Sequence, residues 1–417
     1  MTGHLVSSEQ PMKILVLNSG SSSQKSALFE LGPEDSDDPV PPLWEGKLDW
    51  DGEQERLSIS NAQGKKLRQE RKTPPEKRTA SVQSMLQKLW QGPAAVLRSK
   101  EEIAIVGHRI VHGGAKLTQP VVIDSAVKRE IADLSAIAPL HNRVALEGIE
   151  LIERLLPGTR QISVFDTGFH RTLPLEAKIY SGPYDWYEQG IQRYGFHGIN
   201  HEYCARRAAK LLSNASLKIV SCHLGNGCSL AAILDGKSID TTMGFTPLEG
   251  LMMGTRSGSI DPGIVTYFMR VKDTGYYELD RMLNRRSGLL GISGLSSDMR
   301  DIVDAMRKGD ERARLAFEIF VHRLVCELGA MAASLGGVDV LVFTAGIGEN
   351  SADVRLAACK KLGFLGVHLG EDKNAGAKPD VDISASESTV RVLVIRAQED
   401  WSIARECARL SIGLAQR

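Results

Sequence analysis

The sequence predicts an α/β protein built from two similar domains that face each other across a cleft. Three observations lead to this prediction: strand-like segments alternate with helix-like segments, one strand–turn–strand unit occurs twice, and glycine-rich turns follow several apolar runs. Alternating strands and helices are typical of sheets covered by helices. A chain of 417 residues is long enough for two or three domains, each with its own core.

The repeated unit is a hairpin with a glycine turn. Residues 12–29 align with residues 217–234 without a gap, 205 positions apart, and Gly20 falls on Gly225. In each copy an apolar run leads into the turn and a second apolar run follows it, which is the pattern of a β-hairpin. Glycine allows an anion to approach the backbone N–H groups of such a turn. Chance similarity is the alternative, but the glycine and both apolar runs coincide, so we predict a duplicated, phosphate-binding unit.

The composition is that of an ordinary soluble globular protein. Hydrophobic residues make up 42% and charged residues 24% of the chain, and 51 basic residues balance 51 acidic ones. No overall charge would therefore attract nucleic acid or an anionic membrane. The six cysteines show neither a C-x-x-C pair nor metal-finger spacing, and no apolar run approaches the ~20 residues of a membrane helix. We expect a cytoplasmic protein with reduced thiols and without a nucleic-acid or membrane partner.

The first half of the chain carries signals for a sheet with helices. A Pro-rich acidic segment at 32–42 is expected to be a surface loop, and weak alternation over residues 43–72 predicts further antiparallel strands. The later elements that we expect are a helix at 80–97, a buried strand at 103–111, helices at 126–137 and 143–156, and a strand at 162–165. A change of domain is expected near residues 168–175.

The second half starts its regular elements with the repeated hairpin and continues with helices. A Gly/Thr-rich loop is expected at 241–263. The elements that follow are helices at 262–271, 276–285, 299–307 and 310–335, a strand at 338–343, a glycine turn at 346–350, a helix after Ser351, a strand at 392–395 and a helix at 399–414. We expect the final helix to pack on the first domain.

Glycine turns at strand ends are the strongest sign of a binding site. The chain has no G-x-x-x-x-G-K-[ST] or G-x-G-x-x-G motif, but glycine turns occur at 18–23, 223–227 and 346–350. One such turn can be free of ligand, whereas three in a chain with a duplicated hairpin favour a polyphosphate site. His197 and His201 have the spacing of a zinc pair, but the glutamate of that motif is absent, which disfavours zinc.

Several charged residues beside these turns are candidates for chemistry. Arg109 and Arg256 each follow glycine-containing segments without a carboxylate nearby in sequence, so they could bind an anionic substrate or be surface charges. Asp166 ends a strand and could face a ligand or cap a turn. Lys25 could reach a phosphate or be a solvated strand lysine, and His197 could be catalytic or a packed core residue.

The carboxylates at helix starts have two interpretations as well. Asp298 precedes a helix, and Glu399 and Asp400 open the last helix. Each could bind a ligand or only stabilise the helix N-terminus.

Nine motifs in the same order resemble the acetate kinase (acetokinase) family from about residue 12 to residue 410. They are NSGSSSQK (18–25), GHRIVHGG (107–114), APLHN (138–142), FDTGFH (165–170), RYGFHG (193–198), HLGNG (223–227), GFTPLEGLMMGTRSG (244–258), SDMRD (297–301) and AGIGEN (345–350). Together these motifs are specific, although no single one is. The resemblance implies two duplicated actin/ribonuclease-H-like domains that flank a nucleotide cleft. Residues 1–168 would form an acid-binding domain completed by a helix at 400–417, and residues 169–399 a nucleotide-binding domain.

The resemblance also implies an activity and residue roles. The activity is reversible, Mg²⁺-dependent phosphoryl transfer from ATP to acetate, direct and in line, giving acetyl phosphate and ADP in a homodimer; Mn²⁺ could replace Mg²⁺. Asn18 and Glu399 would serve the metal. The catalytic residues would be Asp166, which would orient the nucleophile or the metal, and His197 and Arg256, which would stabilise the transferring phosphoryl group. Arg109 would bind the carboxylate of acetate. The methyl group of acetate would contact Val111, Leu140, Phe196 and Pro247. The residues assigned to ATP are Lys25, His223, Leu224, Gly225, Asn226, Gly227, Asp298, Met299, Arg300, Gly346, Ile347, Gly348, Glu349 and Asn350.

Two alternatives and some departures from the family pattern remain. The chain could phosphorylate propionate or butyrate, or it could be a nucleotide-switched binding protein of the actin/Hsp70 kind. The presence of Arg109, Asp166, His197 and Arg256 together favours an enzyme, because a switch would not need them. Ile199-Asn200 replaces a usual Thr-Ser, Arg143 stands at a common proline, and Gln398-Glu399-Asp400 stands at a usual Asn-Glu-Glu.

Overall fold

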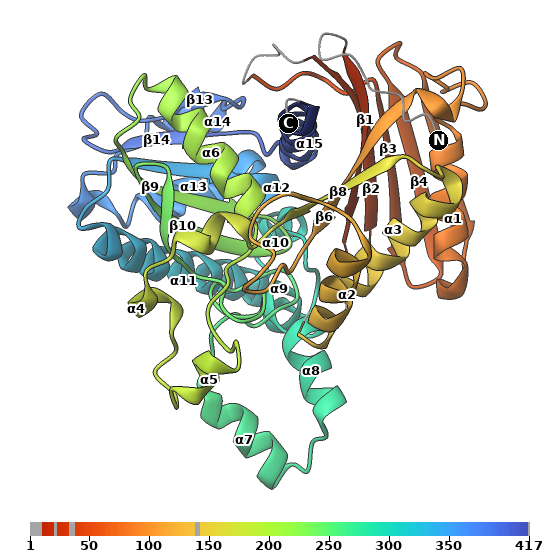
Figure 1. Ribbon diagram of the computed structural model, residues 1–417. Helices are drawn as coiled ribbons and strands as arrows, with labels where there is room; N and C mark the ends of the chain where they lie inside the picture. Colours follow the sequence, from red (N-terminus) through yellow and green to blue (C-terminus); the bar gives the residue numbers. More distant parts are fainter. Residues whose placement is uncertain (1–10, 21–22, 33–37, 138–141, 416–417) are drawn as a thin grey trace. The chain divides into compact units, whose positions relative to one another are not determined.

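The computed structural model describes residues 11–20, 23–32, 38–137 and 142–415. The chain divides into two compact units: unit 1 is Met1–Gly168 with Gln398–Arg417, and unit 2 is Phe169–Ala397. Each unit contains one mixed β-sheet with helices packed on it (Figure 1). The predicted α/β class is therefore confirmed.

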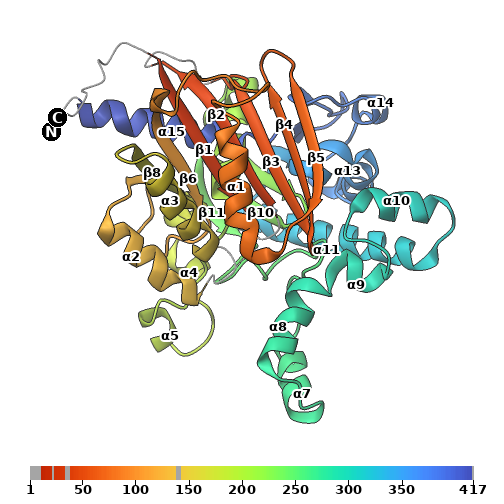
Figure 2. The ribbon, with the colours of Figure 1, turned by 90° about the vertical axis from the view of Figure 1, so that its right-hand side faces the viewer.

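The sheet of unit 1 has eight strands in the order β5-β4-β3-β2-β1-β6-β8-β7 (Figure 2). In that order they are Lys66–Lys72, Gln54–Asn61, Trp44–Asp51, Ser23–Leu31, Met12–Ser19, Ile103–Ile110, Arg160–Phe165 and Val121–Val122. β1 is antiparallel to β2 and parallel to β6, and β6 is parallel to β8. The antiparallel strands expected over residues 43–72 are present as β3, β4 and β5.

The sheet of unit 2 repeats this topology. Its order is β11-β10-β9-β12-β14-β13, with bounds Lys237–Thr241, Cys228–Leu234, Lys218–Leu224, Val340–Thr344, Arg391–Val394 and Val381–Asp382. β9 is antiparallel to β10 and parallel to β12, which is parallel to β14. In both units the antiparallel strands are followed by parallel strands and an antiparallel edge strand, which confirms the predicted duplication.

The two hairpins differ by one residue in pairing. Asn18 is opposite Lys25 in unit 1, whereas His223, which aligns with Asn18, is opposite Ser229. An ungapped alignment, in which Leu230 corresponds to Lys25, would place Leu230 opposite His223. The difference arises because four residues separate the last paired positions of the first hairpin, Ser19 and Gln24, whereas three separate Leu224 and Cys228 in the second.

Helix α15 (Glu399–Ala415) packs against β1, β2 and β6 of unit 1. Its approach to the sheet depends on Gly107 in β6. A Cβ atom at this position would lie 2.7 Å from Cys407 Sγ and 2.8 Å from Ile403 Cγ2, both on α15. Any side chain there would push the helix away from the strand.

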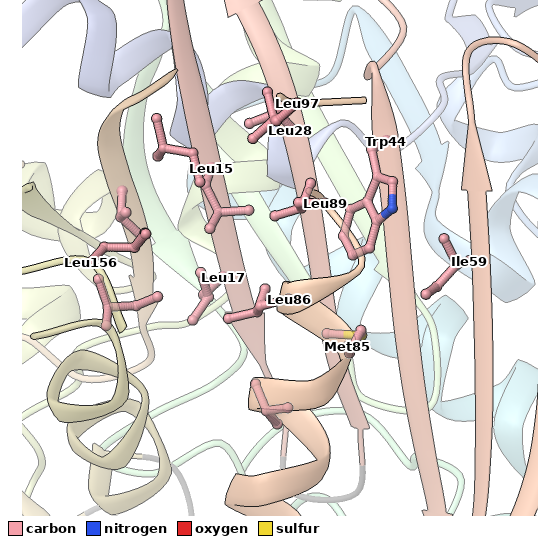
Figure 3. Close-up of a cluster of buried hydrophobic side chains, with 14 of the residues drawn as sticks. Leu15, Leu17, Leu28, Trp44, Ile59, Met85, Leu86, Leu89, Leu97 and Leu156 are labelled. Atoms are coloured by element: carbon pink, nitrogen blue, oxygen red, sulfur yellow. The ribbon is translucent and has the colours of Figure 1, made fainter. Parts of the chain in front are cut away.

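The opposite side of this sheet carries the main core of unit 1 (Figure 3). Trp44 is fully buried there among apolar side chains from β1, β2, α1 (Arg78–Gln87) and α3 (Asn142–Leu155). The predicted helix at 80–97 is too long, because α1 ends at Gln87. Leu89 is nevertheless buried in the same core, so its apolar character reflects packing and not a helical turn.

Among the remaining helices, those near residues 126–137, 262–271, 276–285, 299–307 and 310–335 and the helix after Ser351 were predicted, whereas the others were not. Unit 1 also has α2 (Ser125–Asp133), and the unit 2 helices are α4 (Leu175–Lys178), α5 (Asp185–Glu188), α6 (Gly198–Leu211), α7 (Pro262–Val271), α8 (Tyr276–Arg285), α9 (Gly288–Ser293), α10 (Met299–Arg307), α11 (Glu311–Leu335), α12 (Ala345–Asn350), α13 (Ala352–Cys359) and α14 (Glu371–Ala375). The expected glycine turn at 346–350 is wrong, since this segment forms α12. No helix in the described part of the chain is long and apolar enough to cross a membrane.

Candidate active site

The first group of candidate residues lies at the carboxyl ends of the parallel strands of unit 1. Asn18 is near the end of β1, Arg109 is near the end of β6, and Asp166 follows β8. The first turn of α15 places Glu399 and Asp400 beside Asn18. The carboxyl ends of the strands are where open α/β sheets bind their ligands.

Hydrogen bonds join these five side chains. Arg109 Nη2 donates to Asp166 Oδ2 at 2.5 Å, and its Nη1 donates to Asn18 Oδ1 at 3.2 Å. The Asn18 amide nitrogen donates to Asp400 Oδ1 at 2.8 Å and to Glu399 Oε2 at 3.3 Å. The Arg109 side chain is 14% exposed and that of Asp166 1%, so water screens this ion pair poorly.

The carboxylates of this group would be stabilised by a cation. Burial disfavours the charged form of Arg109, but the carboxylates of Asp166 and Glu399 outweigh it and raise the pKa of Arg109. Burial raises the pKa of the Asp400 carboxyl, and neighbouring Glu399 raises it further. Burial disfavours the charged form of Asp400, and the charge of Glu399 lies next to it. A bound cation would stabilise both carboxylates in their charged form.

The donor atoms fit a hard divalent metal. The carboxylate oxygens of Glu399 and Asp400 and the amide oxygen of Asn18 are ligands of the kind that Mg²⁺ prefers. Within the described residues no group of three or more His, Cys, Asp or Glu side chains is arranged to hold a metal. A metal at Asn18 and Glu399 would therefore keep several waters, as Mg²⁺ commonly does.

Lys25 lies beside this group. It pairs directly with Asn18 across the β1–β2 ladder, so both side chains point to the same face, and its charge acts on Asp400. The Lys25 side chain is exposed, which leaves its ammonium group accessible to an anion.

The residues predicted to surround a methyl group come from both units. Val111 follows β6 and is 6% exposed, whereas Phe196 of unit 2 is 1% exposed and Pro247 is half-buried. Leu140 lies outside the described residues. That these four side chains line one pocket stays a prediction.

The second group of candidates surrounds the glycine turn of unit 2. The rings of His197 and His223 are stacked, with their centroids 3.9 Å apart and their planes at 7°. His223 belongs to β9, and His197 precedes α6 in a left-handed conformation with a φ of 56°. A non-glycine residue held there costs on the order of 1–3 kcal/mol, and such strain concentrates at functional sites.

Arg256 lies beside the same turn. Its Nη1 donates to the carbonyl oxygen of Pro247 at 3.1 Å, and no carboxylate of the described residues forms an ion pair with it. Burial lowers the pKa of Arg256, and the like charge of Arg285 lowers it further. A partly buried guanidinium without a carboxylate partner is prepared to bind an anionic ligand.

The three features meet at Gly227. A Cβ atom on this glycine would lie 3.5 Å from His197 Nε2 and 3.6 Å from Arg256 Nη1. The absence of a side chain therefore leaves a small space that faces an imidazole nitrogen and a guanidinium. A tetrahedral phosphoryl group has the size and charge for such a space.

A cavity of about 800 Å³ adjoins this turn. It is large enough for a nucleotide-sized ligand. Eight of the predicted ATP-binding residues line it: Gly225, Asn226, Asp298, Met299, Arg300, Gly346, Ile347 and Asn350. Asp298 caps α10 by accepting a hydrogen bond from Arg300 N, so the cap interpretation and the cavity position hold together.

Other predicted ATP residues of unit 2 do not line the cavity. His223, Leu224, Gly227, Gly348 and Glu349 are not among its lining residues. Gly348 packs under the end of β12, where a Cβ atom would lie 3.3 Å from the carbonyl carbon of Phe343. Glu349 accepts a hydrogen bond from Ala397 N at 2.8 Å. We interpret Gly348 and Glu349 as residues that shape α12.

The cavity also contains residues that sequence reasoning missed. Ser297 is the first residue of the SDMRD motif and Ser351 directly follows the AGIGEN motif, so both positions could have been inferred from these motifs. Arg307 and Asp353 form an ion pair at 3.0 Å on the cavity wall. These two residues are distant in sequence, and no local pattern joins them.

Comparison with solved structures defines the class of protein. An acetate kinase from Porphyromonas gingivalis is 40% identical, with a TM-score of 0.84 over 95% of this chain and 98% of that one. A propionate kinase from Francisella tularensis is 36% identical, with a TM-score of 0.85 and the same two coverages. The duplicated sheets and these neighbours define a phosphotransferase with an actin/ribonuclease-H-like fold and a carboxyl group as acceptor.

The family follows from the sequence comparisons. The family model of the acetokinase family matches residues 13–405. An acetate kinase from Nostoc sp. (strain PCC 7120) is 54% identical over 405 residues, which cover 96% of this chain and 99% of that relative. The chain belongs to the acetokinase family.

Proposed function

We propose that the chain transfers the γ-phosphoryl group of ATP to acetate, reversibly and in line, giving acetyl phosphate and ADP. The observation that carries this proposal is Arg256, a guanidinium that has no carboxylate partner in the described part of the chain and adjoins His197 and Gly227 beside a nucleotide-sized cavity. Phosphoryl transfer depends on cations and donors around the group in flight, and a switch protein does not need them. The Nostoc acetate kinase is more similar to this chain than the Francisella propionate kinase, which favours acetate over propionate.

The residues of unit 1 suit an acceptor that is already an anion. Acetate is ionised at neutral pH, so the reaction needs no strong general base. Asp166 is held by Arg109 and is therefore proposed to orient that guanidinium and the acetate carboxylate. Arg109 is proposed to bind the carboxylate, while His197 and Arg256 stabilise the transferring phosphoryl group.

One assay tests the function directly. The purified chain is incubated with ATP and Mg²⁺ and with acetate, propionate, butyrate or no acid, and hydroxylamine traps any acyl phosphate. We expect acetohydroxamate in proportion to ADP released. ADP release that does not depend on any acid, without hydroxamate, would contradict the proposal and favour the nucleotide-switched alternative.

The metal is proposed to be Mg²⁺, with Mn²⁺ as a substitute, held by Asn18 and Glu399. Bound with ATP it would neutralise phosphate charge. Asn18→Ala and Glu399→Ala should each raise the Mg²⁺ concentration for half-maximal activity by about tenfold, because Mg²⁺ has few protein ligands and each contributes. The measurement is a Mg²⁺ titration at fixed free ATP. Glu147→Ala, an exposed carboxylate of unit 1, is the control. Unchanged titrations in both variants would reject this metal site.

The choice of acid is proposed to depend on Val111. Removing two of its methyl groups in Val111→Ala should make room for one more methylene, which is worth roughly 1–3 kcal/mol in an apolar pocket. Wild type should therefore prefer acetate over propionate by about 10–200-fold in kcat/KM, and the variant should narrow this ratio mainly through KM. The measurement is kcat/KM for both acids. Equal losses for both acids would show that Val111 only packs the end of the strand.

We also propose that the protein is a homodimer. Helices α7 and α8 extend away from the sheet of unit 2 (Figure 1) and expose large apolar side chains, including Met269 at 55%, Tyr276 at 69% and Tyr277 at 86%. Such a patch is typical of a protein interface. Sedimentation should give the mass of two chains, and Met269→Glu should shift it toward one.

A further inference from the structure

Behind the stacked His197 and His223 rings lie two buried polar residues that the proposed mechanism does not use. Asn200 and His201 are consecutive in the first turn of α6, and both are 0% exposed. Neither lines the nucleotide cavity. Fully buried polar side chains need hydrogen-bond partners, and the partners here are the residues around the site.

Asn200 determines where His223 carries its proton. The amide nitrogen of Asn200 donates to His223 Nδ1 at 2.9 Å and to Thr344 Oγ1 at 3.3 Å, and its oxygen is 3.9 Å from Cys204 Sγ. A ring nitrogen that accepts a hydrogen bond has no proton, so a neutral His223 carries its proton on Nε2. A Cβ atom on Gly225 would lie 3.8 Å from this Nε2, which therefore faces the glycine turn.

His201 reaches His197 through Ser229. His201 Nε2 lies 2.8 Å from Ser229 Oγ, and Ser229 Oγ lies 2.9 Å from His197 Nδ1. His201 Nδ1 lies 2.9 Å from Ser221 Oγ, so both of its ring nitrogens have partners. Burial lowers the pKa of His201 well below its usual value, and one ring nitrogen of the neutral imidazole donates while the other accepts.

The direction of the hydrogen bonds from His201 through Ser229 to His197 decides which ring nitrogen of His197 carries the proton. If His201 Nε2–H donates to Ser229 and Ser229 donates to His197 Nδ1, the His197 proton is on Nε2. The opposite direction also satisfies each bond but leaves Nε2 as an acceptor. Phosphoryl oxygens only accept hydrogen bonds, so the proposed function requires the first direction.

We infer that Asn200 and His201 are positioning residues that hold His223 and His197 with their ring protons on Nε2. The two stacked rings then present a matched pair of N–H donors to one phosphate group at the glycine turn. Neutral rings can stack at 3.9 Å, whereas two imidazolium ions at that distance would repel each other. This inference rests on the proposed function, because the phosphate oxygens require the hydrogen bonds to run from His201 through Ser229 to His197.

The test replaces a donor by an acceptor of the same shape. In Asn200→Asp an ionised carboxylate can only accept, so a neutral His223 carries its proton on Nδ1 and loses its Nε2–H donor. We expect kcat to fall by about 10–100-fold, as for a lost donor at a transition state, with the KM for acetate within about threefold of wild type. Asn200→Ser keeps an O–H donor and should retain most of kcat. Asn214→Asp makes the same exchange in the exposed loop after α6 and should leave activity unchanged.

A second variant tests the other half of the arrangement. Ser229→Ala removes the hydroxyl between His201 and His197, so we expect kcat to fall by about tenfold or more without a matching rise in KM. Ser229→Thr keeps the hydroxyl and should restore part of the loss.

Imidazole ¹⁵N NMR on histidine-labelled protein gives a readout that does not depend on activity. Wild type should show protonated Nε2 and unprotonated Nδ1 for both His197 and His223, and Asn200→Asp should reverse this for His223. A wild-type spectrum with the His223 proton on Nδ1, or equal kcat losses in Asn200→Asp and Asn200→Ser, overturns the inference. If wild type forms no acetyl phosphate, the proposed function fails separately, and the spectra still report the tautomers.

Discussion

Replacing Arg256 by alanine is expected to lower kcat about 10³-fold, with the KM for ATP changed by less than about threefold. The expectation follows from the surroundings of the guanidinium. Among the residues that the structure describes, a single backbone carbonyl is its close oxygen partner, and its Nη1 faces the space left at Gly227 together with His197 Nε2. Charge on a phosphoryl group increases around its equatorial oxygens during transfer, so this cation acts mainly in the transition state.

Steady-state kinetics with ATP varied at saturating acetate measure this prediction. Arg281→Ala is a matched control, because Arg281 is an exposed arginine of unit 2 that pairs with Glu278 on its own helix. Arg256→Lys should recover little activity, since an ammonium group cannot reproduce the planar fork of donors. A loss of less than about tenfold in kcat would assign Arg256 to the structure of its loop.

Replacing Arg109 by alanine is expected to raise the KM for acetate about 100-fold, because two charge-assisted hydrogen bonds to a carboxylate contribute roughly 3 kcal/mol together. Arg109 is also the partner of Asp166, which is 1% exposed. The variant leaves the Asp166 carboxylate without the guanidinium of Arg109, so we also expect the free energy of unfolding to fall by about 3 kcal/mol.

Comparison of two Arg109 variants separates binding from stability. Arg109→Lys keeps a positive charge near Asp166 and should regain stability, but it should keep most of the rise in the KM for acetate. Arg160→Ala, at the exposed amino end of β8, is the control for loss of a surface arginine from the same sheet. A wild-type KM for acetate in Arg109→Ala would remove Arg109 from the acid site and leave it only as a partner of Asp166.

Local patterns in the sequence predicted the elements whose apolar residues recur at regular spacing. The two hairpins, the long helix α11 and the strand β12 have apolar residues at regular spacing, and the structure confirms them. Helix α6 was not predicted, because Asn200 and His201 are buried as hydrogen-bonding groups and interrupt the apolar pattern. Segment 345–350 was expected to be a turn because its glycines disfavour a helix, but Ala345 in a left-handed conformation starts a short one.

The candidate site shows the same division between local and distant information. Residues inside motifs, such as Asp298 and Asn350, could be assigned to the cavity from the sequence because each motif stays together in the fold. The ion pair between Arg307 and Asp353 and the chain from His201 to His197 depend on tertiary structure that places distant segments side by side. No periodicity or spacing in one sequence encodes such pairs.

The packing of α15 on β1 has a consequence for how the protein is synthesised. Unit 1 joins the beginning of the chain to its end, whereas unit 2 is one continuous segment. During translation β1 leaves the ribosome long before α15 is made. Unit 2 is therefore synthesised before α15, so β1 has to wait for its helix, and Asn18 for Glu399, until α15 has left the ribosome.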